Sequence, residues 1–492
     1  MWRSLWLWIG STGMLKLQGG EMNRRNFLAN TVLAAGASAL AVSAQNSDQS
    51  VHVTVHRDQP LGVIAPDFMG LGYEISSVAR PGLLNGANSV YVQLVRTLGA
   101  RGVIRIGGNT SDFAHYSATA AAVSSAYGTV VNDAMLRDLG GFLKATGWKL
   151  IWGLDLGKGS ESEAVAEANA VSSIAGERLM AVEMGNEPDL FPNQKHRMSE
   201  YGYGDWLAEY RRSKTALRTR FPRIPLAGPD VAGKTDWVTQ FAADEGKDAG
   251  LLTHHYYREG QNPNSTVEKL LGVDPKLQPQ LDQLSAASRK CGLPYRICEV
   301  NSFSGGGRPG VSDTMAAALW VLDYMFTLAT NGCSGVNMET GVNHRDFISS
   351  YSPIGDDEHG HYSAKPEYYG MLAFSLGGNG RLLKAEMDAS APDVKAYATQ
   401  PDQGGLTLTL INKRARGSAV IVVTGSHTQS SRAAVTRLSG PAIDAKSGVR
   451  LGGAEVTPAG TWKPMKPEVL QVRNGRLRIK LPAASAAIVE IR

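Results

Sequence analysis

The chain has 492 residues, which is too long for one small core and predicts a large domain together with a smaller one. Hydrophobic residues make up 43% of it and charged residues 19%, a balance that excludes a largely disordered protein. The net charge of +5 is small and comes without a long basic run, so it weakly favours an acidic substrate and does not favour nucleic acid. Three cysteines, an odd number with no zinc spacing, predict neither a disulfide framework nor a metal site.

The first recognisable segment, residues 22–44, has the pattern of an export signal. Arg24 and Arg25 precede an apolar stretch that runs from Phe27 to Ala44 and ends in small residues. Paired arginines, an apolar core and a small-residue cleavage site are typical of twin-arginine signal peptides. A membrane anchor is the alternative, but the polar and small residues in the stretch disfavour a stable span. We therefore expect a periplasmic or secreted protein.

Residues 66–380 repeat one unit, in which a short apolar segment is followed by polar turn residues and a helical pattern. The predicted strands are 68–74, 103–108, 149–156, 179–187, 224–230, 251–257, 295–299 and 335–340. Helical spacing of apolar residues is found in 89–98, 132–145, 203–220, 279–290 and 313–330. Strands that alternate with helices predict an α/β fold, a (β/α)8 barrel. A doubly wound open sheet is the alternative, but the first strand lacks the glycine-rich phosphate turn that it requires.

Residues 381–492 change to the alternating pattern of β-strands, as in 406–410 and 477–481, with Gly, Asp, Asn and Pro between them. This pattern predicts a C-terminal β-sandwich. The segment 51–65 precedes the barrel, and its first residues alternate in the same way. We therefore expect an N-terminal strand that joins the sandwich and ties the two domains together.

Two of the predicted barrel strands end in a glutamate. Glu187 ends the fourth strand and is followed by Pro188, which cannot continue the ladder, and Glu299 ends the seventh. The active sites of such barrels lie at the C-terminal ends of the strands. A pair of carboxylates is sufficient to cleave a glycosidic bond, because one donates a proton and the other meets the charge at the sugar carbon. The alternatives are a solvated turn for Glu187 and an ion pair for Glu299, for which Arg105 on the second strand is a suitable partner.

Four stretches at the strand ends resemble glycoside hydrolase family 79, which contains heparanases and β-glucuronidases: residues 104–113, 185–188, 254–257 and 299–313. The most specific stretch is 299–307, which includes a triglycine. The resemblance covers the barrel and the C-terminal domain. It implies a retaining mechanism, in which Glu187 is the acid/base and Glu299 is the nucleophile that forms a covalent glycosyl-enzyme. Arg105 would support the nucleophile by holding it ionised.

The same resemblance implies a set of substrate-binding residues. The N–H groups of Gly305 and Gly306 match positions that bind the sugar carboxylate, and glycines allow such a close approach to an anion. The other residues expected to bind substrate are Asn186, Asp112, Asn109, Tyr257, His344 and Tyr351. The alternatives are a flexible loop for the glycines and barrel packing for Tyr257. Animal heparanases carry a tyrosine where this chain has Ser304, so the fine substrate preference stays open.

We therefore predict a retaining exo-β-glucuronidase that releases terminal β-linked glucuronic acid, with or without a 4-O-methyl group, from a polysaccharide or glycoconjugate. Exo action is expected because residues 343–362 are long enough to close one end of the cleft. The alternatives are an endo-acting heparanase-like enzyme, a retaining β-glycosidase for neutral sugars, and a carbohydrate-binding protein without catalysis. No cofactor, metal, nucleic acid or stable protein partner is inferred.

Overall fold

The computed structural model of the protein describes residues 50–123, 128–341, 349–388, 391–425 and 432–492. The predicted export signal, residues 22–44, lies outside the described residues, and so does His344. The signal and the periplasmic or secreted location therefore stay predictions. None of the helices in the described ranges combines the length and the apolar character that crossing a membrane requires.

Eight parallel strands form the first sheet. Their order is β7 (Leu179–Met184), β6 (Lys149–Leu154), β3 (Val103–Gly107), β2 (Gly70–Glu74), β11 (Val336–Glu339), β10 (Tyr295–Asn301), β9 (Leu251–Tyr257) and β8 (Ala227–Val231). A parallel bridge between Val182 and Leu226 joins the two ends of the sheet and closes it. The (β/α)8 barrel predicted from the sequence is therefore confirmed.

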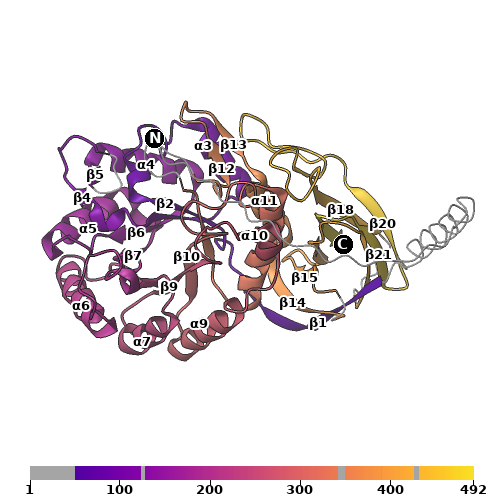
Figure 1. The fold of residues 1–492 in the computed structure, drawn as a ribbon, viewed down its shortest axis with the longest axis horizontal. Helices are drawn as coiled ribbons and strands as arrows, with labels where there is room; N and C mark the ends of the chain where they lie inside the picture. Colours follow the sequence, from indigo (N-terminus) through magenta and orange to yellow (C-terminus); the bar gives the residue numbers. More distant parts are fainter. Residues whose placement is uncertain (1–49, 124–127, 342–348, 389–390, 426–431) are drawn as a thin grey trace, which may run out of the picture. The chain divides into compact units, whose positions relative to one another are not determined.

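Helices surround the barrel strands (Figure 1). They are α2 (Ile75–Val78), α3 (Ser89–Leu98), α4 (Asp133–Thr146), α5 (Glu161–Ala175), α6 (Tyr203–Arg220), α7 (Thr235–Glu245), α8 (Val267–Leu271), α9 (Leu277–Cys291), α10 (Met315–Thr330) and α11 (Pro366–Gly377). Local sequence sets several of their ends. Ser160 and Glu163 form a capping box at the start of α5. Gly147, with a φ of 79°, ends α4 in the left-handed conformation that glycine adopts without a steric penalty.

A small apolar layer fills the barrel interior. It consists of Val103, Ile151, Ala181, Ala227, Leu251 and Cys298. Alternate residues of a regular strand face the same side of a sheet, so in β3 and β7 the residue two positions further on also faces inward. Arg105 follows Val103 and Glu183 follows Ala181 in this way, and neither side chain is exposed. The barrel therefore carries a layer of charged side chains directly above an apolar layer, towards the C-terminal ends of its strands.

A second sheet contains ten strands. Their order is β19 (Arg450–Leu451), β18 (Arg432–Ser439), β20 (Glu468–Arg473), β21 (Arg476–Leu481), β17 (Ala419–Thr424), β1 (Ser50–Ile64), β14 (Gly380–Met387), β15 (Val394–Gln400), β16 (Leu406–Asn412) and β22 (Ser485–Ile491). Because β18 also pairs with β22, the sheet wraps around a second apolar core. Strand β1 lies between β17, to which it is parallel, and β14, to which it is antiparallel. The N-terminal strand therefore belongs to the C-terminal sheet.

Short pairs of strands complete the described elements: β4 (His115–Tyr116) with β5 (Val130–Val131), and β12 (Ile354–Asp356) with β13 (Tyr362–Ala364). Helix α10 joins the barrel to the second sheet through Asp323, which accepts hydrogen bonds from Tyr397 Oη at 2.6 Å and Lys413 Nζ at 2.8 Å. Helix α11 packs closely against α10, because Gly370 lies on the backbone of α10 near Ala318.

We expect the substitution Gly370→Ala to lower the free energy of unfolding by about 3 kcal/mol, as overpacking of a core does. A Cβ atom at this position would lie 2.1 Å from the carbonyl oxygen of Ala318 and 2.5 Å from Val321 Cγ1, so the two helices would have to separate. Urea unfolding followed by circular dichroism measures the change. Gly204→Ala is the matched control, because a Cβ there meets nothing within 4 Å on an exposed turn of α6. An unchanged midpoint for Gly370→Ala would contradict the close packing of α10 and α11.

Candidate active site

The two glutamates that the sequence singles out lie together at the mouth of the barrel. Glu187 follows β7 in the turn before a short 3-10 helix (Pro188–Leu190), and Glu299 lies in β10. They are 8% and 6% exposed. One oxygen of each carboxylate and one ring nitrogen of His255 all lie within 4.8 Å of one another. A retaining glycosidase has its carboxyl groups about 5 Å apart, whereas an inverting one needs about 6.5–9.5 Å to admit a water. The spacing therefore fits a retaining pair.

The backbone at Glu187 is held in an uncommon conformation. Glu187 has a φ of 52° and Asp230 a φ of 59°, both in the left-handed region, which costs energy for residues other than glycine. The N–H of Glu187 donates to the carbonyl oxygen of Asp230 at 2.9 Å. The carboxylate of Asp189 accepts hydrogen bonds from three consecutive N–H groups, those of residues 232–234. The loops after β7 and β8 thus hold each other, and they fix the direction of the Glu187 side chain.

Arg105 connects the strands below these glutamates. Its guanidinium donates to Glu183 Oε2 at 3.1 Å, Glu299 Oε2 at 2.9 Å, Asn186 Oδ1 at 2.8 Å and Asp230 Oδ2 at 2.6 Å. Burial lowers the pKa of Arg105, but the carboxylates of Asp230 and Glu183 outweigh burial and raise the pKa well above its usual value. Arg105 therefore stays charged and orients side chains from three other strands and the turn after β7.

His255 bridges the site to Asp230. Its Nδ1 lies 3.0 Å from Glu187 Oε1, and its Nε2 lies 2.8 Å from Asp230 Oδ1. Burial lowers the pKa of His255, but the carboxylates of Asp230 and Glu299 raise it well above its usual value. Burial raises the pKa of Glu187, the hydrogen bond from His255 opposes this, and the charge of Glu299 adds to it. The 3.0 Å contact therefore allows His255 and Glu187 to share a proton, which is the arrangement that an acid requires.

Both oxygens of Glu299 accept a hydrogen bond. Tyr257 Oη donates to Oε1 at 2.9 Å, and Arg105 donates to Oε2 at 2.9 Å. The ring of Tyr257 stacks on Tyr351, with 6.2 Å between the ring centroids. Two donors stabilise the ionised form of a carboxylate and fix its orientation. The structure thus places Tyr257 and Tyr351 beside Glu299, on the side away from His255.

The predicted sugar-binding residues after β3 and β7 differ in their exposure to solvent. Asn186 Nδ2 donates to Asn109 Oδ1 at 3.2 Å, and Asn109 is exposed. Asp112 is only 1% exposed, and its carboxylate accepts the N–H groups of Leu156, Gly157 and Asn186 at 3.1, 3.0 and 2.9 Å. Asp112 therefore holds three loop ends together, and its direct contact with a sugar stays a prediction.

The triglycine lies beside the site with its backbone in the left-handed region. Gly305, Gly306 and Gly307 have φ angles of 77°, 88° and 78°. Gly306 accepts hydrogen bonds from the N–H of Ser350 at 2.7 Å and from its hydroxyl at 2.9 Å, which joins the loop to the segment that carries Tyr351. Within the described ranges, no group accepts the N–H of Gly305 or Gly306. Adjacent backbone N–H groups of this kind are suited to bind an anion.

Two further carboxyl groups face Glu299 from β2 and β11. Burial and then the charge of Glu299 raise the pKa of Glu74 to about 7, and they raise the pKa of Glu339 well above its usual value. Glu74 accepts hydrogen bonds from the N–H and hydroxyl of Thr110 at 2.8 and 2.7 Å. Glu339 Oε2 is buried and has no hydrogen-bond partner among the described residues. Neutral carboxyl groups can donate hydrogen bonds, so both are suited to contact sugar hydroxyls.

Sequence reasoning missed the roles of Glu183 and Asp230, and it noted His255 only within a motif. A signal for Asp230 was present, because it ends a predicted barrel strand as Glu299 does. Glu183 lies inside a predicted strand, where a charged residue is costly unless it is paired. That rule alone indicates a buried partner, and the structure identifies Arg105.

Comparisons with known proteins agree with this geometry. The model of the glycosyl hydrolase family 79 C-terminal beta domain matches residues 396–488. A β-glucuronidase of Aspergillus niger is 27% identical over 415 residues, which cover 76% of this chain and 75% of that protein. A β-glucuronidase of Neurospora crassa is 26% identical over 377 residues, which cover 66% of this chain and 65% of that protein. A 4-O-α-L-rhamnosyl-β-D-glucuronidase from Fusarium oxysporum has the same fold, with a TM-score of 0.76 and 19% identity over 89% of this chain and 100% of that one.

The barrel and its pair of closely spaced glutamates define the class as the two-carboxylate (β/α)8-barrel glycoside hydrolases. Within that class the chain is a homologue of the glycoside hydrolase family 79 β-glucuronidases, and the model of that family's C-terminal β domain matches residues 396–488. The family resemblance seen in the sequence is therefore confirmed.

We expect Arg105→Met to lower the free energy of unfolding by about 3–5 kcal/mol, because it leaves buried carboxylates without their cation. Urea unfolding measures the loss. Arg212→Met is the matched control, since Arg212 pairs with Glu161 at 3.3 Å and its side chain is 60% exposed, where ion pairs contribute little. If the two substitutions change the midpoint equally, the conclusion that Arg105 stabilises the buried carboxylates is wrong.

Proposed function

We propose that the protein is a retaining β-glucuronidase that releases terminal β-linked glucuronic acid from a polysaccharide or glycoconjugate. The observation that carries the proposal is the buried pair Glu187 and Glu299, whose oxygens lie within 4.8 Å of each other. The related β-glucuronidases of Aspergillus niger and Neurospora crassa support the choice of sugar. Release from chain ends, rather than internal cleavage, is the expected mode.

In the first step, Glu299 attacks the anomeric carbon of the bound sugar while Glu187 protonates the leaving oxygen. The bond from Glu299 to the sugar forms as the glycosidic bond breaks. Arg105 and Tyr257 hold the attacking carboxylate in one orientation, which reduces the entropic cost of reaching the transition state. His255 supports Glu187 through the 3.0 Å contact, so the acid is positioned before the substrate binds.

In the second step, Glu187 is ionised and acts as a base. It takes a proton from a water molecule, which attacks the anomeric carbon and displaces Glu299. Burial then favours the return of the proton to Glu187, which restores the acid for the next cycle. Each step inverts the anomeric centre once, so the product keeps the β configuration.

Recognition of the glucuronate carboxylate is assigned to the triglycine loop. The N–H groups of Gly305 and Gly306 are donors without an acceptor in the described part of the chain, and they suit an anion. Tyr351, which is joined to this loop through the neighbouring Ser350, lies close enough to Tyr257 to stack on it. Two adjacent N–H donors can bind a carboxylate more strongly than a neutral hydroxyl group, and this difference favours the glucuronide.

The panel of p-nitrophenyl β-glucuronide, β-glucoside, β-xyloside and α-arabinofuranoside tests this assignment. We expect the chain from residue 45 onward to cleave the glucuronide far faster than the others, because the free N–H donors stabilise only a sugar that carries an anion. Rates of nitrophenol release measure the preference. A preference for a neutral sugar would remove the glucuronide from the proposal, and cleavage of none would favour endo action or a binding protein.

Substitution of the two glutamates distinguishes their roles. Glu299→Ala should lose nearly all hydrolysis of every substrate, because no glycosyl-enzyme can form. Glu187→Ala should lose about 10²–10⁴-fold on poor leaving groups and much less on 2,4-dinitrophenyl glycosides, which need no proton. Azide should restore turnover of Glu187→Ala and give a glycosyl azide of retained configuration. Activity close to that of the unmodified chain for Glu299→Ala would show that the nucleophile is another residue.

A further inference from the structure

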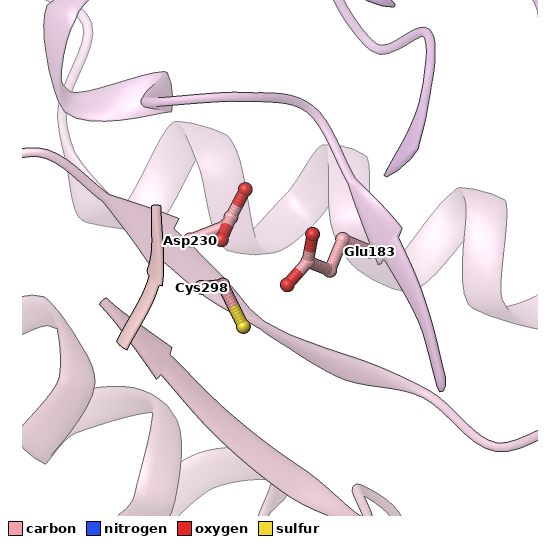
Figure 2. A group of neighbouring side chains, drawn as sticks. All are labelled: Glu183, Asp230 and Cys298. Carbon is pink, nitrogen blue, oxygen red and sulfur yellow. The ribbon is translucent and has the colours of Figure 1, made fainter. Parts of the chain in front are cut away.

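Below the catalytic glutamates lies a second group of ionisable side chains. Glu183 from β7, Asp230 from β8 and Cys298 from β10 are neighbours in the barrel interior (Figure 2), and one ligand-type atom of each lies within 4.8 Å of the others. Glu183 and Cys298 are fully buried, and Asp230 is 1% exposed. None of the three has a place in the steps described above that touch the sugar.

Two cationic side chains of the protein, Arg105 and His255, already contact these carboxyl groups. Arg105 donates to Glu183 Oε2 and to Asp230 Oδ2, and His255 Nε2 lies against Asp230 Oδ1. Three of the four carboxylate oxygens of Glu183 and Asp230 therefore have a partner. The fourth, Glu183 Oε1, is buried and has no hydrogen-bond partner among the described residues when both groups are drawn as carboxylates.

A buried, ionised oxygen without a donor is costly, and two carboxylates so close together repel each other. A single proton on Glu183 removes both costs, because the group can then donate to Asp230, which can still accept from Arg105 and His255. The alternative position for the proton, on Asp230, is disfavoured because both Asp230 oxygens already face donors.

We propose that Glu183 is a neutral carboxyl group that donates a hydrogen bond to Asp230, and that it acts as a positioning residue for Glu187. The chain of contacts runs from Glu183 to Asp230, from Asp230 to His255 Nε2, and from His255 Nδ1 to Glu187. In this arrangement Asp230 is ionised and Glu183 is neutral. This inference rests on the proposed function for its activity readout only.

The surroundings of Glu183 support this protonation state. The charged and titratable groups that face it are Asp230 on β8, Arg105 on β3, His255 on β9, and Cys298 and Arg296 on β10. Burial, and then the charge of Asp230, raise the pKa of Glu183 to about 7, while Arg105, His255 and a weak hydrogen bond from the Cys298 thiol oppose the rise. The pKa of Asp230 is lowered, because Arg105 and His255 outweigh the effect of its burial.

If Glu183 is neutral, two substitutions of it should have different effects on turnover. Glu183→Gln keeps a donor for Asp230 and an acceptor for Arg105, so it should keep turnover. Glu183→Met fills a similar volume without either, so Asp230 and Arg105 shift and kcat should fall by about tenfold or more, with a smaller change in KM. Rescue by Gln after loss by Met is the signature of positioning through a neutral donor. If Gln is as damaging as Met, Glu183 acts as an anion and the proposal is wrong.

Thermal unfolding tests the proton without any substrate. A carboxyl whose pKa rises from 4.5 to about 7 on folding gives stability that is full below pH 4.5 and is lost as the pH rises through 7. Glu183→Gln lacks this loss, so its melting temperature relative to the unmodified chain should rise by about 2–4 °C between pH 5 and pH 8. A difference that stays constant or falls over this range would show that Glu183 is ionised, and it would overturn the proposal even if no glycoside were cleaved.

Glu167 provides the matched control. It is also buried, accepts a hydrogen bond from Trp152 Nε1 at 2.9 Å, and has a pKa that burial raises to about 8. Glu167→Gln should show the same rise in relative melting temperature with pH. Glu167→Met should leave kcat unchanged, because Glu167 has no contact with the chain that leads to Glu187. Equal losses of kcat for Glu167→Met and Glu183→Met would reduce the effect of Glu183 to general damage and overturn its positioning role.

Discussion

The arrangement of the active site depends on one buried cation, the guanidinium of Arg105. It lies at the height where the barrel interior changes from an apolar layer to a polar one, and it donates to carboxylates from β7, β8 and β10 and to the amide of Asn186. A planar group with five donors can satisfy several acceptors at fixed angles, which the single ammonium of a lysine cannot do. The strand ends that carry Glu187 and Glu299 are therefore tied to one rigid centre, and their separation is a property of the barrel rather than of flexible loops.

The two glutamates differ because their neighbours differ. Glu299 accepts hydrogen bonds from a phenol and a guanidinium, which fix the orientation of its carboxyl group. Glu187 faces a histidine that is itself held by Asp230, in a buried setting that favours the protonated form. Different environments a few ångströms apart are what the two proposed roles, acid and nucleophile, require of two residues of the same type. Glu187 and Asp230 both have a left-handed backbone conformation, which sets the direction of their side chains. Both carboxyl groups face His255 as a result.

The sequence was sufficient to predict the barrel, the strand that carries Glu299 and the β character of the C-terminal domain, because periodicity and strand-end residues are local signals. The predicted strand 179–187 is shorter than expected: β7 ends at Met184, and Glu187 lies in the turn that follows. The same signals placed residues 51–65 in a strand, and β1 lies in the C-terminal sheet. What could not be predicted was the network around Arg105. Glu183, Asp230 and His255 come from three strands, and only the closure of the sheet brings them to one point. The role of Asp112 in joining three loop ends could not be predicted from the sequence for the same reason. Its partners are backbone N–H groups that are distant in sequence.

The charge of the site suits an anionic sugar in spite of its many carboxyl groups. Burial raises the pKa values of Glu74, Glu183 and Glu339, which reduces the negative charge that these three groups carry. Because like charges repel each other, fewer ionised carboxyl groups in the site make the approach of an acidic substrate less costly. The proposed binding of the substrate carboxylate by the backbone N–H groups of Gly305 and Gly306 needs no further cation, which would compete with Arg105 for Glu299. The raised pKa values of the buried glutamates thus have two effects. They lower the repulsion between carboxyl groups within the barrel, and they lower the repulsion of a negatively charged sugar at the C-terminal ends of the strands.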